Sequence, residues 1–178
     1  EGLLGDRAVV HHPHLGGAGG GQLAVAGAVF APMRGEEYHA VLGGGAWATG
    51  AWEGERRLAC RPSPPLDQAL VSTGFNYVAD VREQQAEVAR RLIPLVRDIR
   101  RGGSAAIDLC DVAAGRLDGY YERGLHPWDV AAGALIARES GALTTGRHPD
   151  SPPSSDLTVA ASPGVLKPLL GLLDEFGA

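Results

Sequence analysis

Helical and strand-like patterns alternate from residue 69 to the end of the 178-residue chain. Apolar residues at helical spacing are separated by short apolar runs that glycine or proline bounds. This alternation is typical of an α/β layer in which helices cover a partly parallel sheet. The predicted elements are strand Ala69–Thr73, helix Val81–Ile99, helix Ser104–Ala114, strand Leu117–Glu122, helix Pro127–Ser140, strand Leu157–Ala161 and helix Pro163–Phe176.

The helix predicted at Val81–Ile99 has the clearest amphipathic pattern in the chain. Val81, Val88, Leu92, Leu95 and Ile99 share one face, whereas the charged residues Glu83, Glu87, Arg90, Arg91 and Arg97 point elsewhere. Proline at position 94 lacks a backbone N–H, so we expect it to kink the helix or split it. The helix at Pro127–Ser140 is apolar nearly all round, which predicts that it is buried.

The first half of the chain has the pattern of antiparallel hairpins. Short apolar or alternating runs predict strands at Leu23–Ala31, Glu37–Leu42, Ala46–Thr49 and Arg57–Cys60, with a glycine turn between the second and third. The segment Glu1–Gln22 shows neither period, so we expect loop or poorly ordered chain there. The sequence therefore predicts one domain at 23–178, an α/β (α+β layered) sandwich with an antiparallel sheet followed by a mixed sheet.

Composition excludes several classes of function. A net charge of −5 gives no support to nucleic-acid binding. The longest apolar run, Leu23–Ala31, is far shorter than the roughly 18 residues of a membrane span. The two cysteines have no metal-like spacing, and no secretory signal is visible, so we expect a cytoplasmic protein with no nucleic-acid or membrane partner.

Polar and aromatic residues gather where the predicted strand Leu117–Glu122 gives way to the next helix. Glu122, His126, Trp128 and Asp129 lie within eight positions, at the carboxyl end of a strand, where α/β proteins bind ligands. Carboxylates there suit hard cations such as magnesium. The competing interpretation is structural, because an aspartate in the first turn of a helix caps it and interacts favourably with its dipole.

The run Trp128-Asp129-Val130-Ala131-Ala132-Gly133 resembles the C-terminal motif of the inositol monophosphatase family, which comprises magnesium-dependent, lithium-sensitive sugar phosphatases. Three further segments match that family in the same order: Ala28–Gly50, Val71–Phe75 and Gly103–Ala106. The resemblance covers the chain from about Leu23 to its C-terminus. It implies the C-terminal part of an inositol-monophosphatase-like fold.

The resemblance also implies an activity and a set of roles. A phosphate monoester would be hydrolysed by metal-bound water, with Mg²⁺ as cofactor and a small phosphorylated metabolite as substrate. Asp129 would hold a metal ion, Glu122 would contact substrate hydroxyls, and Gly103, Ser104 and Ala105 would line the substrate pocket near a helix N-terminus. Histidinol phosphate, fructose bisphosphate and phosphoadenosine phosphate are alternative substrates within the superfamily.

The upstream metal ligands of the family are missing. They come from a glutamate on an early helix and an Asp-Pro-x-Asp-Gly-Thr segment, whereas Glu1–Gln22 contains only Glu1 and Asp6 as acids. Truncation, a frameshift or natural divergence would each explain this. One carboxylate binds magnesium weakly, so we expect impaired hydrolysis. The alternative function is a non-catalytic remnant or oligomerisation partner, and uncovered apolar faces lead us to expect a homodimer.

Overall fold

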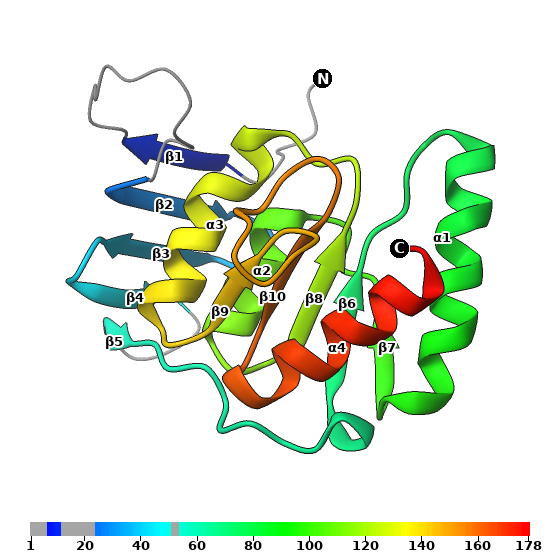
Figure 1. The fold of residues 1–178 in the computed structure, drawn as a ribbon. Coiled ribbons are helices and arrows are strands. Elements are labelled where there is room, and N and C mark those ends of the chain that lie inside the picture. The colour runs from blue at the N-terminus through cyan, green and yellow to red at the C-terminus, as the bar shows by residue number, and fades with distance from the viewer. Residues whose placement is uncertain (1–6, 12–23, 51–53) are drawn as a thin grey trace.

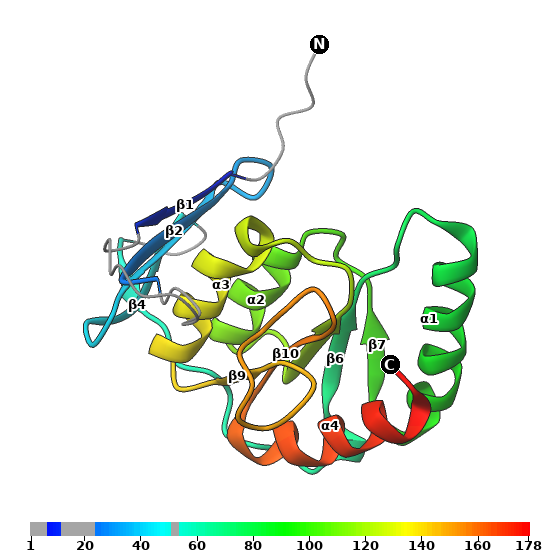
Figure 2. The same ribbon diagram turned by 45° about the horizontal axis from the view of Figure 1, so that its top comes forward.

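The computed structural model describes residues 7–11, 24–50 and 54–178. These residues form two β-sheets and four α-helices arranged in four layers (Figure 1). In Figure 2 the first sheet lies on the outside, α2 and α3 lie between the two sheets, and α1 and α4 cover the other face of the second sheet. The predicted layered α/β sandwich is confirmed.

The first sheet is antiparallel throughout. Within the described residues its strand order is β1 (Arg7–His11), β2 (Ala26–Ala31), β3 (Glu36–Val41), β4 (Gly45–Thr49) and β5 (Arg56–Arg57). The predicted hairpins are confirmed, except that the last strand lies at Arg56–Arg57 and not at Arg57–Cys60. The expectation of loop in Glu1–Gln22 is wrong for β1, which pairs with β2 in register from Arg7↔Phe30 to His11↔Ala26. That pairing supplies backbone hydrogen bonds that no local sequence pattern reveals; residues 1–6 and 12–22 lie outside the described residues.

The second sheet is mixed, as predicted. Its order is β7 (Asp98–Arg100), β6 (Leu70–Thr73), β8 (Gly119–Glu122), β10 (Thr158–Ala161) and β9 (Leu143–Thr145). The strand β6 runs parallel to both β7 and β8, whereas β10 is antiparallel to β8 and β9. Two of these strands, β7 and β9, were not predicted, because three residues are too few to show an alternating pattern.

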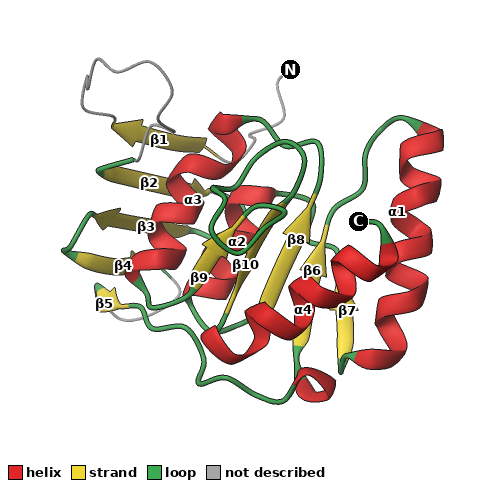
Figure 3. Cartoon of the chain, in the orientation of Figure 1, coloured by secondary structure: helices red, strands yellow, loops and turns green. Residues whose placement is uncertain are grey.

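The α-helices are α1 (Ala79–Leu92), α2 (Ala105–Ala113), α3 (Pro127–Glu139) and α4 (Pro163–Phe176), shown in red in Figure 3. Three of them agree with the sequence to within a residue at each end. The first does not, because the α-helical hydrogen bonding stops before Pro94, a 3₁₀ turn spans Ile93–Leu95, and Ile99 lies in β7. Within the described residues, none of the helices combines the length and apolarity that crossing a bilayer requires.

The central helices are held very close to each other and to the first sheet. A Cβ added at Gly133 of α3 would lie 2.8 Å from the Leu109 Cβ of α2, and one at Gly27 of β2 would lie 3.0 Å from the Ala132 Cα. Most of α3 from Val130 to Ala137 is buried, as its apolar pattern predicted. Glycines at these two points therefore set the spacing of the inner layers.

A network of charged groups joins α2 to the first sheet. The Arg116 guanidinium contacts a Glu36 carboxylate oxygen at 2.6 Å and an Asp111 oxygen at 3.0 Å. Arg34 donates to both Asp111 oxygens at 2.9 Å. The hydrogen bonds from Arg116 hold the pKa of Glu36 below its usual value, although burial opposes them. Because Glu36 is 4% exposed and Asp111 7%, the two arginines neutralise charges that water does not solvate.

Candidate functional site

Three loops meet at one edge of the second sheet, because β6, β7 and β8 are parallel and their carboxyl ends lie on the same side. These loops are Gly74–Val78, Arg101–Ser104 and Arg123–His126. A Cβ added at Gly124 would lie 3.0 Å from the Asn76 side-chain nitrogen, so the first and third loops touch. This edge is the candidate site that the sequence predicted.

Glu122 ends β8 and turns its carboxylate toward the first loop. Its Oε2 accepts a hydrogen bond from the Tyr120 hydroxyl at 2.8 Å. A Cβ at Gly74 would lie 2.1 Å from the carboxylate, so only glycine fits opposite Glu122. Burial raises the pKa of Glu122, while the Tyr120 hydrogen bond and the charge of Arg101 act in the opposite direction. Glu122 is therefore a half-buried acid held in one place.

Asp129 lies in the first turn of α3, as predicted. The His126 backbone N–H donates to Asp129 Oδ2 at 2.8 Å, and the Asp129 N–H donates to the His126 carbonyl at 3.0 Å. The helix-capping interpretation of this aspartate is thus confirmed. It leaves the other carboxylate oxygen without a hydrogen bond among the described residues. Beside it the Trp128 ring is 67% exposed and stacks on the His126 ring at 4.6 Å.

Gly103, Ser104 and Ala105 lie at the start of α2. Gly103 has a φ of +95°, which strongly favours glycine, and Ser104 is the residue before the helix. The first N–H groups of a helix have no partner within it, so those of Ala105 and Ala106 are available to an acceptor at this edge. The structure therefore brings all of the predicted site residues to the same edge of the sheet.

Asp108 is a residue of this edge that was not predicted to belong to the site. It is 3% exposed, its Oδ1 accepts a hydrogen bond from the Ser72 hydroxyl at 2.8 Å, and its Oδ2 has no hydrogen-bond partner in the described part of the chain. Burial raises the pKa of Asp108 to about 6, and the charges of Asp111 and Glu122 add to that effect. An acidic residue in the first turn of a mostly apolar helix was the available signal.

The three carboxylates of this edge are close enough to influence the same tyrosine, but with the other described residues they do not form a metal site. Burial raises the pKa of Tyr120, and the nearby charges of Glu122, Asp108 and Asp129 raise it further. Oxygen donors are the ligands that magnesium prefers. However, the described residues contain no group of three His, Cys, Asp or Glu side chains placed to hold a metal ion. Within the described residues, this edge therefore offers magnesium an incomplete set of ligands.

Comparison with known proteins agrees with this arrangement. A model of the inositol monophosphatase family matches residues 17–174. An inositol-1-monophosphatase of Mycobacterium bovis is 48% identical over 160 residues, which are 90% of this chain and 55% of the relative. A relative from Pasteurella multocida, named Nus factor SuhB, is 40% identical over 84% of this chain and 57% of its own length. The chain thus spans somewhat more than half the length of these relatives.

A solved structure gives the same result. The fold matches Mycobacterium tuberculosis SuhB with a TM-score of 0.78 and 48% identity, over 86% of this chain and 60% of that one. Because the family model covers most of the chain and the fold agrees, this chain belongs to the inositol monophosphatase family.

Proposed function

We propose that this chain supplies part of the site of a magnesium-dependent hydrolase of small phosphate monoesters. Family membership supports a phosphatase of this type. The observation that carries the proposal is the meeting of three loops after parallel strands, which brings Glu122, Asp129 and the start of α2 to a single edge. A magnesium ion bound there would act as a Lewis acid toward the phosphate.

Each residue of the edge has a proposed part. Asp129 keeps one oxygen free of protein hydrogen bonds and would be a metal ligand. Glu122, fixed by Tyr120, would accept hydrogen bonds from hydroxyls of the substrate. The free N–H groups at the start of α2, next to Gly103–Ala105, would face the phosphate, because helix N-termini favour anions.

Hydrolysis by this chain alone is proposed to be impaired. A single carboxylate holds magnesium weakly, and the described residues present no group of three potential ligands that includes Asp129. We therefore derive no catalytic step through the metal. Inositol phosphate remains the leading candidate substrate, with histidinol phosphate, fructose bisphosphate and phosphoadenosine phosphate as the alternatives.

The test is phosphate release from these four esters, with and without magnesium. The relative from M. bovis serves as a positive control on inositol phosphate. Asp129→Asn and Asp67→Asn are compared, since Asp67 is an exposed aspartate that precedes β6, at the opposite end of the parallel strands. We expect release by this chain to be far below that of the control. Release equal to the control and lost only in Asp129→Asn would contradict the proposed impairment. Release that both variants retain would contradict the role of Asp129.

Of the partner predictions made from the sequence, we keep the small metabolite and withdraw the exclusion of nucleic acid. A small phosphorylated metabolite stays as the expected ligand. The exclusion of nucleic-acid partners rested on net charge alone, and a 40% identical relative carries the name Nus factor SuhB, so we do not extend that exclusion to this chain.

The predicted homodimer stays a proposal, and the outer face of the first sheet is the surface that supports it. Phe30 of β2 is 45% exposed and Val41 of β3 is 55% exposed there, and no helix of the described chain covers them. Sedimentation velocity of the chain at micromolar concentration tests it. A single species of 18.5 kDa would contradict the dimer.

A further inference from the structure

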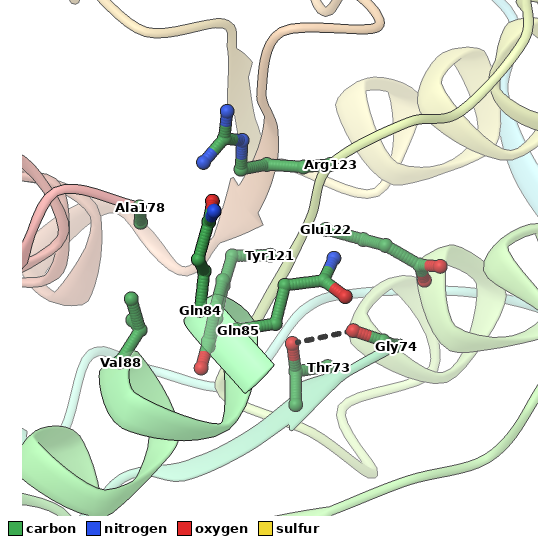
Figure 4. A pocket seen from close by; sticks show the side chains of 9 residues that line it. All are labelled: Thr73, Gly74, Gln84, Gln85, Val88, Tyr121, Glu122, Arg123 and Ala178. Atoms are coloured by element: carbon green, nitrogen blue, oxygen red, sulfur yellow. Dashed lines mark hydrogen bonds between the residues drawn. The ribbon is translucent and has the colours of Figure 1, made fainter. Parts of the chain in front are cut away.

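A pocket lies beside the candidate site, between the carboxyl ends of β6 and β8 and the first turns of α1 (Figure 4). Its empty volume is about 280 Å³, which includes space open to solvent. The pocket and the candidate site share a wall, because Gly74 and Glu122 line both. The Glu122 carboxylate points away from the Gln84 and Arg123 side chains that line the pocket (Figure 4).

The polar side chains of the pocket are mostly hydrogen-bond donors. Gln85 is 9% exposed, and its Oε1 accepts a hydrogen bond from the Asn76 backbone N–H at 2.7 Å. Its amide nitrogen is left to donate, because no hydrogen bond within the described residues uses it. The Arg123 guanidinium likewise has no ion pair or hydrogen bond among the described residues. A ligand rich in acceptor oxygens fits such a set.

A buried hydroxyl at the pocket is unsatisfied. Tyr121 is 5% exposed, and its hydroxyl has no hydrogen-bond partner among the described residues. Burial raises the pKa of Tyr121, and the nearby Thr73 hydroxyl, which also lies 3.5 Å from the Gly74 carbonyl oxygen, acts in the opposite direction. An unsatisfied buried polar group is costly and calls for an occupant such as an ion or a water molecule.

The negative charges around the pocket are already engaged. The Glu122 carboxylate accepts a hydrogen bond from the Tyr120 hydroxyl. Both carboxylate oxygens of Asp156 accept hydrogen bonds from Arg147. The pKa of Asp156 is lowered mainly by Arg147, and the charge of Arg123 adds to that effect. The carbonyl oxygen of Ala178 at the pocket also accepts from Arg147. Arg123 is thus the cation at this pocket that has no close anionic partner among the described residues.

We propose that this pocket is a second subsite that binds a small oxyanion, with Arg123, Gln84 and Gln85 as its donors and Tyr121 at its inner end. The oxyanion is either free or a second anionic group carried by the substrate, and the latter case rests on the proposed hydrolase function. The shared Gly74–Glu122 wall places the two subsites next to each other, so one small bifunctional ligand can span them.

The experiment is titration of the isotope-labelled chain with inorganic phosphate in the absence of magnesium, followed by NMR. Side-chain signals of Gln85 and Arg123 report on the pocket, and backbone amides of Ser104 and Ala105 report on the candidate site. We expect the pocket signals to shift. Loss of one charge-assisted donor in Arg123→Gln should weaken this binding about tenfold. Arg97→Gln is the matched control. Arg97 is exposed and immediately precedes β7, so it lies at the end of the parallel strands opposite to the pocket.

Tyr121→Phe is the second variant, since it keeps the ring and removes only the hydroxyl. We expect phosphate binding to weaken about threefold while the free energy of unfolding is unchanged or rises. Shifts confined to Ser104 and Ala105, or equal weakening in Arg123→Gln and Arg97→Gln, would overturn the proposal. Because magnesium and hydrolysis are not involved, failure of the proposed function leaves this result unaffected.

A bisphosphorylated ester distinguishes the two sources of the oxyanion. If the substrate carries the second anion, fructose bisphosphate shifts the signals of both subsites at lower concentration than inorganic phosphate, and Arg123→Gln removes that advantage. If the pocket takes a free oxyanion, the two ligands bind it with equal affinity. A bisphosphate that shifts neither Gln85 nor Arg123 would count against the subsite.

Discussion

The His126 backbone N–H donates a hydrogen bond to the Asp129 carboxylate at 2.8 Å, so the residue proposed to hold a metal also closes the first turn of α3. The Oδ2 atom of Asp129 accepts this hydrogen bond, whereas the other carboxylate oxygen takes no part in it. The helix therefore fixes the direction of the carboxylate before any ligand arrives, which is an advantage for a residue with a binding role.

Substitutions at Asp129 should measure its structural role at the start of α3 separately from any role in binding. Asp129→Ala removes the acceptor at the helix start and should cost about 1 kcal/mol of unfolding free energy. Asp129→Asn keeps an acceptor oxygen and should cost about half of that. Urea denaturation measures both. Equal losses in the two variants would contradict the capping geometry.

Asp108 should make stability depend on pH. Its folded pKa of about 6 lies above the value near 4 of an unfolded aspartate, so the folded protein binds more protons between these values. Stability should therefore fall as pH rises from about 4 to 6 and stay lower above that window. Asp108→Asn should raise the unfolding free energy at pH 7 by on the order of 2 kcal/mol, an advantage that disappears below about pH 4. Urea denaturation across this range tests it, with the exposed Asp150→Asn as control; a gain that is independent of pH would contradict burial as the cause.

Replacement by alanine should change the stability of the protein in opposite directions at two helical glycines. Gly133→Ala places a methyl group 2.8 Å from the Leu109 Cβ and should destabilise the protein by about 2 kcal/mol, despite a better helix propensity. Gly171 of α4 has nothing within 4 Å of an added Cβ, so Gly171→Ala should stabilise by up to about 1 kcal/mol. Thermal unfolding of both variants tests the close contact of α2 and α3. A stabilising Gly133→Ala would show that the helices are further apart.

The Arg116 network should contribute far more to the free energy of unfolding than an exposed ion pair does. Arg116→Ala leaves Glu36 and Asp111 short of a counter-charge and should cost about 2–3 kcal/mol. Arg90→Ala removes a fully exposed pair with Glu87, which solvent screens, so its effect on the unfolding free energy should be much smaller. Both are measured by urea denaturation at pH 7. Similar losses in the two variants would mean that the network is as well solvated as the surface pair.

Much of the fold could be predicted because its periodic segments are long enough to show their pattern. The helix α3 was predicted within one residue from its proline start, its apolar run and the glycine after it. The predictions failed where tertiary pairing decides the outcome. The strand β7 was assigned to the end of a helix because Ile99 continues the spacing of Val88 and Leu92, whereas the parallel partner β6 draws it into the sheet.

The sequence named residues that the fold gathers at one edge, but it did not reveal their surroundings. The resemblance to inositol monophosphatase motifs pointed to Glu122, Asp129 and Gly103–Ala105, which the fold brings to one edge. The burial of Asp108 against Ser72 and the contact of Gly74 with Glu122 join segments about 36 to 48 residues apart, and such contacts leave no local trace in the sequence.

The most direct test of the account is manganese titration of the labelled chain, because Mn²⁺ takes the same oxygen ligands as magnesium and broadens nearby NMR signals. We predict selective broadening of the Asp129 and Glu122 amides with weak, millimolar-range affinity, and its loss in Asp129→Asn but not in Asp67→Asn. Broadening elsewhere, or broadening that Asp129→Asn retains, would contradict the assignment of Asp129 as the metal ligand. Tight binding at Asp129 would contradict the conclusion that this chain supplies only part of the site.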